Sequence, residues 1–383
     1  MRITIVISSL KGGGAERVAV NLANAWVAEG RAVTILTTSQ HEAPPSCAVD
    51  ARVVRRDLGW PRALGEDDVA TESIAAVLRG MQRTGCTDLL SQTVLLASLR
   101  EAILATEPDV VVAHIDVTNI RVIAALHETG IPVVACEHTD TRRVSVGAWQ
   151  SARNALYPHA HAVVAPHASI AQWLADRGMP GVAIANPLVA PPGFVRSFAA
   201  KRRRCLVTLT RLSREKRVDL LVLAFARVAG ELPDWDLDIY GDGPLRGALE
   251  ELAPSPRVRF RGFTSDPYAV LRSADLFVSS SGVEGFGNAI WEALACSVPV
   301  VAVDCGAPVR SLVRHEVDGL LVPHSTVAAL SSALRTVMSD DALRERLASR
   351  APEVLTRLPI AAALAAWDAL LGAAVRREVA HAR

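Results

Sequence analysis

The sequence predicts an α/β protein made of two doubly wound, Rossmann-like domains. Apolar, strand-like runs alternate with helical segments twice along the chain, once before and once after residue 195. The 383 residues suffice for two domains of ordinary size, each with its own core. Between the two runs, Asn186-Pro187 and Pro191-Pro192-Gly193 interrupt the pattern as a hinge would. We therefore expect one domain over residues 1–194, a second over 195–362, and a C-terminal helix over 363–383 that packs back on the first domain.

The chain opens with a β-α-β unit. Strands are predicted at Ile3–Ile7 and Ala32–Leu36, and between them a helix at Glu16–Glu29 carries apolar residues on one face. The glycine-rich turn Gly12–Gly14 leads into this helix. Because Lys11 precedes the glycines, the turn is not a P-loop, and it lacks the G-x-G-x-x-G spacing. It is either an anion-binding loop or only a tight turn.

Polar residues follow two further strands of this domain. The expected elements are a helix at Thr87–Thr106 and strands at Val110–Ala113, Val133–Cys136 and Ala162–Ala165, whereas most of residues 41–100 permits no firm assignment. The first two strands end in His114 and in Glu137-His138. Ligands bind at the carboxyl ends of strands in open α/β sheets. His138 is thus a candidate functional residue and His114 a weaker one, although either can be structural.

The second domain repeats the alternation. The expected order is a strand at Cys205–Leu209, a turn at 211–216, a helix at Arg217–Gly230, and strands at Leu237–Tyr240, Val258–Phe260, Leu276–Ser279, Val298–Val303 and Leu320–Val322. After the strand that ends at Ser279, serines and glycines lead into a helix at Asn288–Ala295, and backbone N–H groups at a helix start can hold an anion. Glu284 and Glu292 bracket this turn. Eight residues of helix span about 12 Å, which is roughly the reach of a nucleotide sugar from its sugar ring to its ribose.

Composition excludes several classes of protein. The net charge is +1 with few aromatic residues, which argues against nucleic-acid binding. The six cysteines form no C-x-x-C pair and are expected to be buried thiols in a reducing compartment. The N-terminus does not read as a signal peptide, and no uncharged apolar run reaches about 18 residues. A cytoplasmic protein is expected.

Five motifs together resemble glycosyltransferase family 4. In order along the chain they are Gly12-Gly-Gly-Ala-Glu-Arg17, Arg211-x4-Lys216, Gly241-Asp-Gly-Pro244, Glu284-Gly-Phe-Gly-x4-Glu292 and Asp318-Gly-Leu-Leu-Val322. The resemblance covers nearly the whole chain and implies the GT-B fold, in which two Rossmann-like domains face each other across a cleft. It also implies retaining transfer of a hexose-type sugar from a nucleotide diphosphate sugar to a hydroxyl of a glycan or lipid-linked acceptor. UDP is the expected nucleotide and GDP the next, with no cofactor besides this co-substrate.

The resemblance assigns roles residue by residue. Arg211 and Lys216 look like the cationic pair that faces the donor diphosphate, so that no metal is needed. Glu284 resembles the carboxylate near the donor sugar, Glu292 the one that binds ribose, and His138 a histidine close to the reacting sugar. The remaining donor-binding candidates are backbone groups of Gly13, Gly14, Gly285, Phe286, Gly287 and Asn288.

Alternatives stay open at this point. A nucleotide-sugar epimerase or phosphorylase of the same fold, or a non-catalytic nucleotide-sugar-binding subunit, fits the same motifs. Asp234-Trp-Asp-Leu-Asp238 contains D-x-D spacing, but we interpret its aspartates as solvating a strand edge and expect no metal site. The basic cluster Lys201–Arg204 is expected on a solvated edge of the linker. Peripheral association with the inner membrane face is expected only by analogy, and Arg142-Arg143 could then meet a phosphate-bearing lipid.

Overall fold

The computed structural model divides into two compact units. It describes residues 1–383 except 42, 61–64, 66–67, 143–146, 191–202, 254 and 382–383, with no side chains described for 377–381. Unit 1 comprises residues 1–187 and 361–383, and unit 2 comprises residues 188–360. The domain boundary predicted between 194 and 195, and the proline-rich part of the predicted hinge, lie outside the described residues.

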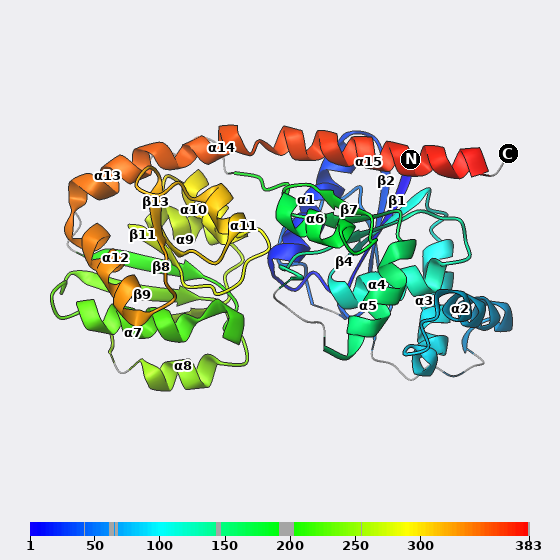
Figure 1. The fold of residues 1–383 in the computed structure, drawn as a ribbon, viewed down its shortest axis with the longest axis horizontal. Helices are drawn as coiled ribbons and strands as arrows, with labels where there is room; N and C mark the ends of the chain where they lie inside the picture. Colours follow the sequence, from blue (N-terminus) through cyan, green and yellow to red (C-terminus); the bar gives the residue numbers. More distant parts are fainter. Residues whose placement is uncertain are drawn as a thin grey trace. The chain divides into compact units, whose positions relative to one another are not determined.

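Unit 1 is built on a parallel sheet with strand order β3-β2-β1-β4-β5-β6-β7. Figure 1 labels four of these strands, β1, β2, β4 and β7. The strands are β1 (Arg2–Ile7), β2 (Ala32–Thr37), β3 (Val54–Asp57), β4 (Val110–His114), β5 (Val133–Cys136), β6 (Ala162–Ala165) and β7 (Gly181–Ala183). In β1, Ile3 is aligned with Val33 of β2 on one side and Val110 of β4 on the other. The edge strands β3 and β7 were not predicted, because neither is buried and neither has an apolar run.

Helices cover both faces of this sheet. They are α1 (Gly14–Ala28), α2 (Thr71–Thr84), α3 (Thr93–Leu104), α4 (Asp116–Leu126), α5 (Gln150–Leu156), α6 (Ala168–Ala175) and α15 (Ile360–His381). Because side chains alternate along a strand, Ile5 packs in the cluster with α1 and α15, whereas Val6 packs in the cluster with α2–α6. The helix predicted at 87–106 is shorter, since a 3-10 turn at Leu90–Gln92 precedes α3.

The C-terminal helix α15 packs on unit 1. Its inward face carries Ala363, Trp367, Leu371 and Ala374, all buried, and the Trp367 ring meets Trp26 of α1 edge to face at 5.7 Å. The helical stretch Asp341–Arg376, which includes most of α15, is long and apolar enough by composition to cross a membrane, with 22% of its apolar window buried. The contacts with unit 1 account for its apolar inner face.

Unit 2 repeats the architecture with strand order β10-β9-β8-β11-β12-β13. Its strands are β8 (Arg204–Leu209), β9 (Trp235–Tyr240), β10 (Val258–Gly262), β11 (Leu276–Ser279), β12 (Val300–Val303) and β13 (Gly319–Val322). Its helices are α7 (Val218–Val228), α8 (Arg246–Leu252), α9 (Pro267–Ser273), α10 (Asn288–Ala295), α11 (Ala307–Leu312), α12 (Val327–Ser339), α13 (Asp341–Arg350) and α14 (Val354–Arg357). Leu206, Ile239 and Val278 from three adjacent strands pack against α7 and α12.

Two parallel, doubly wound sheets confirm the predicted fold class. In each sheet the strand order reverses once, between β1 and β4 in unit 1 and between β8 and β11 in unit 2. Open α/β sheets bind ligands beyond the carboxyl ends of their strands at this reversal. The loops that follow these four strands are therefore where a site is expected. The six cysteines are in the reduced thiol form, and four of them are buried.

Candidate functional site

The turn after β8 carries Arg211 on a rigid backbone. The amides of Thr210 and Leu212, on either side of Arg211, donate hydrogen bonds of 2.9 Å to the carbonyls of Tyr240 and Asp242. A Cβ atom at Gly241 would lie 1.8 Å from the Thr210 carbonyl oxygen, and one at Gly243 would lie 2.4 Å from that of Leu212. The Gly241-Asp-Gly-Pro244 motif thus lets the loop after β9 press directly on the turn that presents Arg211.

The Arg211 side chain is exposed. It forms no hydrogen bond or ion pair with any other residue that the structure describes. Beside it, the hydroxyl of Ser213, a buried residue, donates to the Glu215 carboxylate at 2.5 Å and closes the turn. An exposed guanidinium on a fixed turn is suited to binding an anion.

Lys216 and Glu284 form an ion pair at the same edge of the sheet. Lys216 ends the 3-10 turn Arg214–Lys216, and its Nζ lies 2.7 Å from Oε1 of Glu284. The loop after β11 reaches the turn through two further bonds: Ser280 Oγ donates to the Lys216 carbonyl at 2.9 Å, and the Gly282 amide donates to the Glu215 carbonyl at 2.8 Å. The side chains of Lys216 and Glu284 are only 22% and 15% exposed, so the pair is largely shielded from water. Two residues predicted for different parts of a donor are therefore in direct contact.

The loop residues 285–287 lead into α10. Gly287 has φ 99°, a left-handed conformation that favours glycine, and it caps the helix. Phe286 is buried, and so is Glu292 within α10, at 2% exposure. Glu292 therefore does not lie on a solvated helix face. The amides at the start of α10 lie at the carboxyl end of β11, next to the loop that carries Glu284.

The glycine turn of unit 1 follows β1. Gly13 precedes α1, which begins at Gly14, and both residues are exposed. Gly12 has φ 135° and Gly13 has φ 157°. At Gly13 an added Cβ would come within 2.3 Å of a Glu16 carboxylate oxygen. The turn therefore lies at the strand-order reversal of unit 1, where its exposed backbone is available to a ligand.

Two histidines meet at the ends of β4 and β5. His114 Nδ1 and His138 Nε2 are 3.0 Å apart, and the two rings are nearly parallel, with centroids 5.2 Å apart and an angle of 18° between their planes. His114 is completely buried, whereas His138 is partly exposed. Burial lowers the pKa of His138 to about 4, and burial together with His138 lowers the pKa of His114 well below its ordinary value. Both rings are neutral at pH 7.

Glu137, next to His138, is a further polar residue at this strand end that the sequence did not single out as functional. This residue is buried, accepts a hydrogen bond from the hydroxyl of Tyr157, and lines a small pocket of unit 1 with its neighbours. Burial raises the pKa of Glu137 to about 7, while Tyr157 and Arg153 act in the opposite direction. The pocket is lined by Val18, Cys136, Glu137, His138, Val164, Pro166, Ile184, Ala185, Asn186, Pro187 and Trp367. The sequence feature that could have drawn attention to Glu137 is its position, a charged residue directly after an apolar strand.

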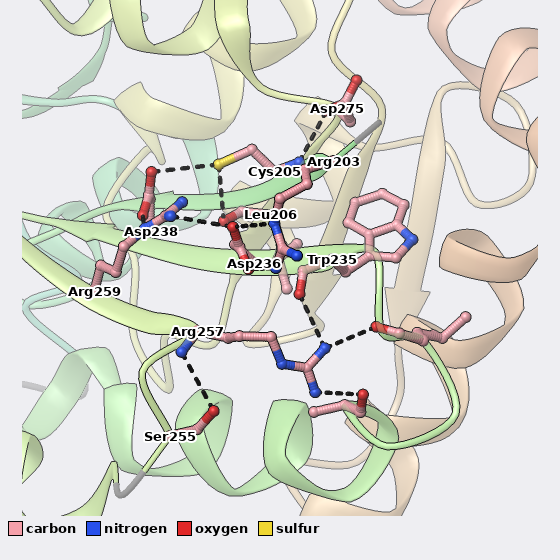
Figure 2. A network of polar contacts seen from close by, with 12 residues as sticks. Arg203, Cys205, Leu206, Trp235, Asp236, Asp238, Ser255, Arg257, Arg259 and Asp275 are labelled. Atoms are coloured by element: carbon pink, nitrogen blue, oxygen red, sulfur yellow. Dashed lines mark hydrogen bonds and ion pairs between the residues drawn. The ribbon is translucent and has the colours of Figure 1, made fainter. Parts of the chain in front are cut away.

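The D-x-D aspartates are not solvating a strand edge, which corrects the sequence interpretation. Asp236 and Asp238 on β9 are buried at 5% and 6% exposure. Two arginines pair with them: Arg203, which directly precedes β8, and Arg259 of β10 pair with Asp236, and Arg259 also binds Asp238 at 2.6 Å (Figure 2). Their charges are thus neutralised within the sheet, and Arg203 of the predicted basic cluster is part of this network.

Other predicted basic residues are also paired. Arg142 Nε bonds Asp140 at 2.8 Å, whereas Arg143, Lys201 and Arg202 lie outside the described residues. Within the described chain, no three His, Cys, Asp or Glu side chains are grouped so that they could hold a metal ion.

Comparison with known proteins matches both halves of the chain. Residues 12–189 match the family model described as Glycosyltransferase Family 4, and residues 194–354 match the one described as Glycosyl transferases group 1. A protein of Streptomyces coelicolor named exopolysaccharide phosphotransferase is 32% identical over 54% of this chain, but the match spans only 22% of its own length. Two further relatives are also matched over less than half of their length.

A relative and several solved structures match over almost their whole length. The Campylobacter jejuni protein named GalNAc-alpha-(1->4)-GalNAc-alpha-(1->3)-diNAcBac-PP-undecaprenol alpha-1,4-N-acetyl-D-galactosaminyltransferase is 25% identical over 92% of this chain and 93% of its own. HepE of Anabaena, solved in complex with UDP and glucose, superposes with a TM-score of 0.74 at 19% identity, over 97% of this chain and 99% of HepE. The structural likeness shows the shared GT-B fold.

Proposed function

Because the chain belongs to glycosyltransferase family 4, we propose that it transfers a hexose-type sugar from a nucleotide diphosphate sugar to a hydroxyl of a glycan or lipid-linked acceptor, with retention at the anomeric carbon. The observation that carries the proposal is the joint position of Arg211, Lys216 and Glu284 at the strand-order reversal of unit 2. Two cations and a carboxylate there match the charges of a diphosphate and the hydroxyls of a sugar.

Arg211 and Lys216 stabilise the leaving group in this proposal. Negative charge accumulates on the diphosphate as its bond to the sugar breaks, and two fixed cations lower the energy of that state without a metal. The bond between the anomeric carbon and the diphosphate oxygen breaks while the acceptor oxygen bonds to the same face of the sugar. The proton of the acceptor hydroxyl leaves with the diphosphate oxygen, so no enzyme nucleophile is required.

Glu284 and Glu292 hold the donor at its two ends. Glu284 accepts hydrogen bonds from sugar hydroxyls once the diphosphate takes over its contact with Lys216. Glu292, buried in α10, accepts bonds from the ribose hydroxyls. The backbone amides of Gly285, Phe286, Gly287 and Asn288 bind sugar and phosphate oxygens between them.

Unit 1 supplies the acceptor side. In this proposal His138 acts on the reacting sugar, and the exposed backbone of Gly13 and Gly14 binds the phosphates and the acceptor. The name of the Campylobacter relative supports an acceptor on a lipid diphosphate, and the UDP bound to HepE supports a UDP-sugar donor. A lipid-linked acceptor would place the protein on the cytoplasmic face of the membrane.

Binding and turnover test the proposal together. Thermal shift of the purified protein is measured against UDP, GDP, ADP and their sugar conjugates, with and without EDTA. We expect stabilisation by a UDP-sugar that EDTA does not change and that Glu292→Ala abolishes. Sugar transfer is then measured with that donor and a panel of glycan and polyprenyl-diphosphate acceptors. Release of epimerised donor, or phosphorolysis without an acceptor, would instead identify an epimerase or a phosphorylase.

A further inference from the structure

His114 is a buried polar residue that the proposed reaction does not use. It ends β4, and its ring is completely enclosed, yet its Nε2 has no hydrogen-bond partner among the described residues. Its other nitrogen, Nδ1, is 3.0 Å from His138 Nε2. A buried ring with one satisfied nitrogen costs stability, because the other nitrogen has lost its contact with water. The single bond to His138 is the only polar contact of this side chain in the described structure.

The backbone around His114 is held in a strained conformation. The next residue, Ile115, has φ 75°, which is a rare conformation for a β-branched side chain. Two bonds maintain it: the Ile115 amide donates to the Cys136 carbonyl at 3.2 Å, and the Asn119 amide donates to the Ile115 carbonyl at 2.8 Å. The Asn119 side chain also donates to the Cys136 carbonyl at 2.9 Å. The ends of β4 and β5, which carry the two histidines, are thus fastened to each other.

The unpaired Nε2 determines which nitrogen carries the proton. A neutral histidine has one N–H and one lone pair. Buried N–H groups without an acceptor are rarer in proteins than buried acceptors without a donor. The proton of His114 is therefore on Nδ1, where it has an acceptor, and the lone pair is on the unpaired Nε2. His114 Nδ1–H then donates to His138 Nε2, so Nε2 of His138 carries the lone pair and its Nδ1 carries the proton.

From this geometry we infer that His114 is a positioning residue, which holds the His138 ring in its Nδ1–H tautomer and directs a hydrogen-bond donor at an oxygen of the sugar or the acceptor. The inference rests on the proposed function, in which His138 contacts the reacting sugar. Neutral histidine in water favours the Nε2–H tautomer, so the bond to His114 must select the other one. The two ring planes differ by 18°, so the bond lies close to the plane of both rings and fixes the orientation of His138.

The tautomer of His138 can be measured by NMR of the ring nitrogens in the intact protein. The protein is labelled with 15N-histidine, and the His138 signals are assigned from a His138→Asn variant. We expect a protonated Nδ1 and an unprotonated Nε2 for His138, with the same pattern for His114. A His138 ring protonated on Nε2 in the wild-type protein would overturn the inference, whatever the activity of the protein. Because no substrate is needed, this result is independent of the proposed function.

Two variants of His114 separate the hydrogen bond from packing. His114→Phe keeps an aromatic ring at this position and removes Nδ1, whereas His114→Asn can place an amide donor near the same position. We expect His114→Phe to lower kcat about tenfold, with a smaller change in the KM for the donor, and to restore the Nε2–H tautomer of His138. His114→Asn should recover most of kcat and the Nδ1–H tautomer.

The outcomes have distinct meanings. If His114→Phe is folded and retains the wild-type kcat, or if both variants lose activity equally with His138 unchanged in tautomer, the positioning role is wrong. If the wild-type protein has the expected tautomer but transfers no sugar from any donor, the proposed function fails and the tautomer assignment stands. Thermal unfolding of both variants shows whether each is folded, and the wild-type NMR result decides the tautomer even if neither variant folds.

Discussion

The ion pair between Lys216 and Glu284 predicts that loss of the Glu284 charge strengthens the binding of a nucleotide diphosphate. The two groups are 2.7 Å apart and mostly shielded from water, so Glu284 competes with any diphosphate for the Lys216 ammonium. Replacing Glu284 by Gln removes that competition and keeps the shape of the side chain. Nucleotide diphosphate without sugar should therefore bind more tightly to Glu284→Gln than to the wild-type protein.

The magnitude follows from the burial of the pair. A fully exposed ion pair contributes up to about 1 kcal/mol, and a hydrogen bond to a charged group about 1.5–3 kcal/mol, before the remaining solvent contact is discounted. We take about 1 kcal/mol for this pair, which is about fivefold in the Kd for UDP. Sugar transfer should change in the opposite direction, with kcat falling about 10²- to 10³-fold, because Glu284 no longer holds the sugar in the transition state.

Titration calorimetry with UDP and with the UDP-sugar donor, together with initial rates, tests this prediction. Lys216→Ala is the matched control: it should lose affinity for both ligands and lose turnover. The double variant measures the coupling of the two residues. In the Lys216→Ala background, the additional change Glu284→Gln should have little effect on the affinity for UDP. Weaker UDP binding in Glu284→Gln, or undiminished turnover, would refute the reasoning.

Three further predictions concern single residues. Arg211→Ala should lower kcat about 10²- to 10³-fold and change the free energy of unfolding by less than about 0.5 kcal/mol, because the exposed side chain has no partner in the described structure. A large loss of stability would contradict this prediction. Gly241→Ala should destabilise unit 2 by about 3 kcal/mol or more in chemical denaturation, because the new Cβ would meet a backbone oxygen at 1.8 Å and φ is 129°. The control Gly247→Ala, with no atom within 4 Å of its Cβ, should be neutral or slightly stabilising. The raised pKa of Glu137 means that the folded protein binds its proton more tightly than the unfolded chain, so stability should fall as pH rises from 4.5 to about 7, by up to about 3 kcal/mol, and Glu137→Gln should flatten that part of the stability profile. An unchanged pH profile in Glu137→Gln would show that the carboxyl is not the group responsible.

Apolar periodicity and turn residues were sufficient to predict the central strands of the two sheets but not the elements at the edges. Central strands such as β4 and β11 are continuous apolar runs because both of their faces are buried. The edge strand β3 is exposed along its whole length, so it lacks the pattern that sequence reasoning depends on. The helix α2 does have an amphipathic pattern, with Ala76, Val77, Gly80 and Met81 on its buried face, and the sequence prediction missed it. The aspartates of β9 were misjudged for a related reason. Their partner Arg259 lies on β10, 21 residues from Asp238, and only the pairing of the strands brings them together.

For the candidate site, the sequence by itself determined which residue types are present and on which strand ends they lie. The spacing of Arg211 and Lys216, and the glycines that allow close approach of two loops, are local properties that a sequence can carry. The contacts between residues were decided by the tertiary structure alone. Lys216 meets Glu284 across 68 residues because β8 and β11 are neighbours in the sheet although two other strands separate them in the chain. His114 meets His138 because β4 and β5 end side by side, and in both cases parallel pairing places at one edge the residues that follow different strands.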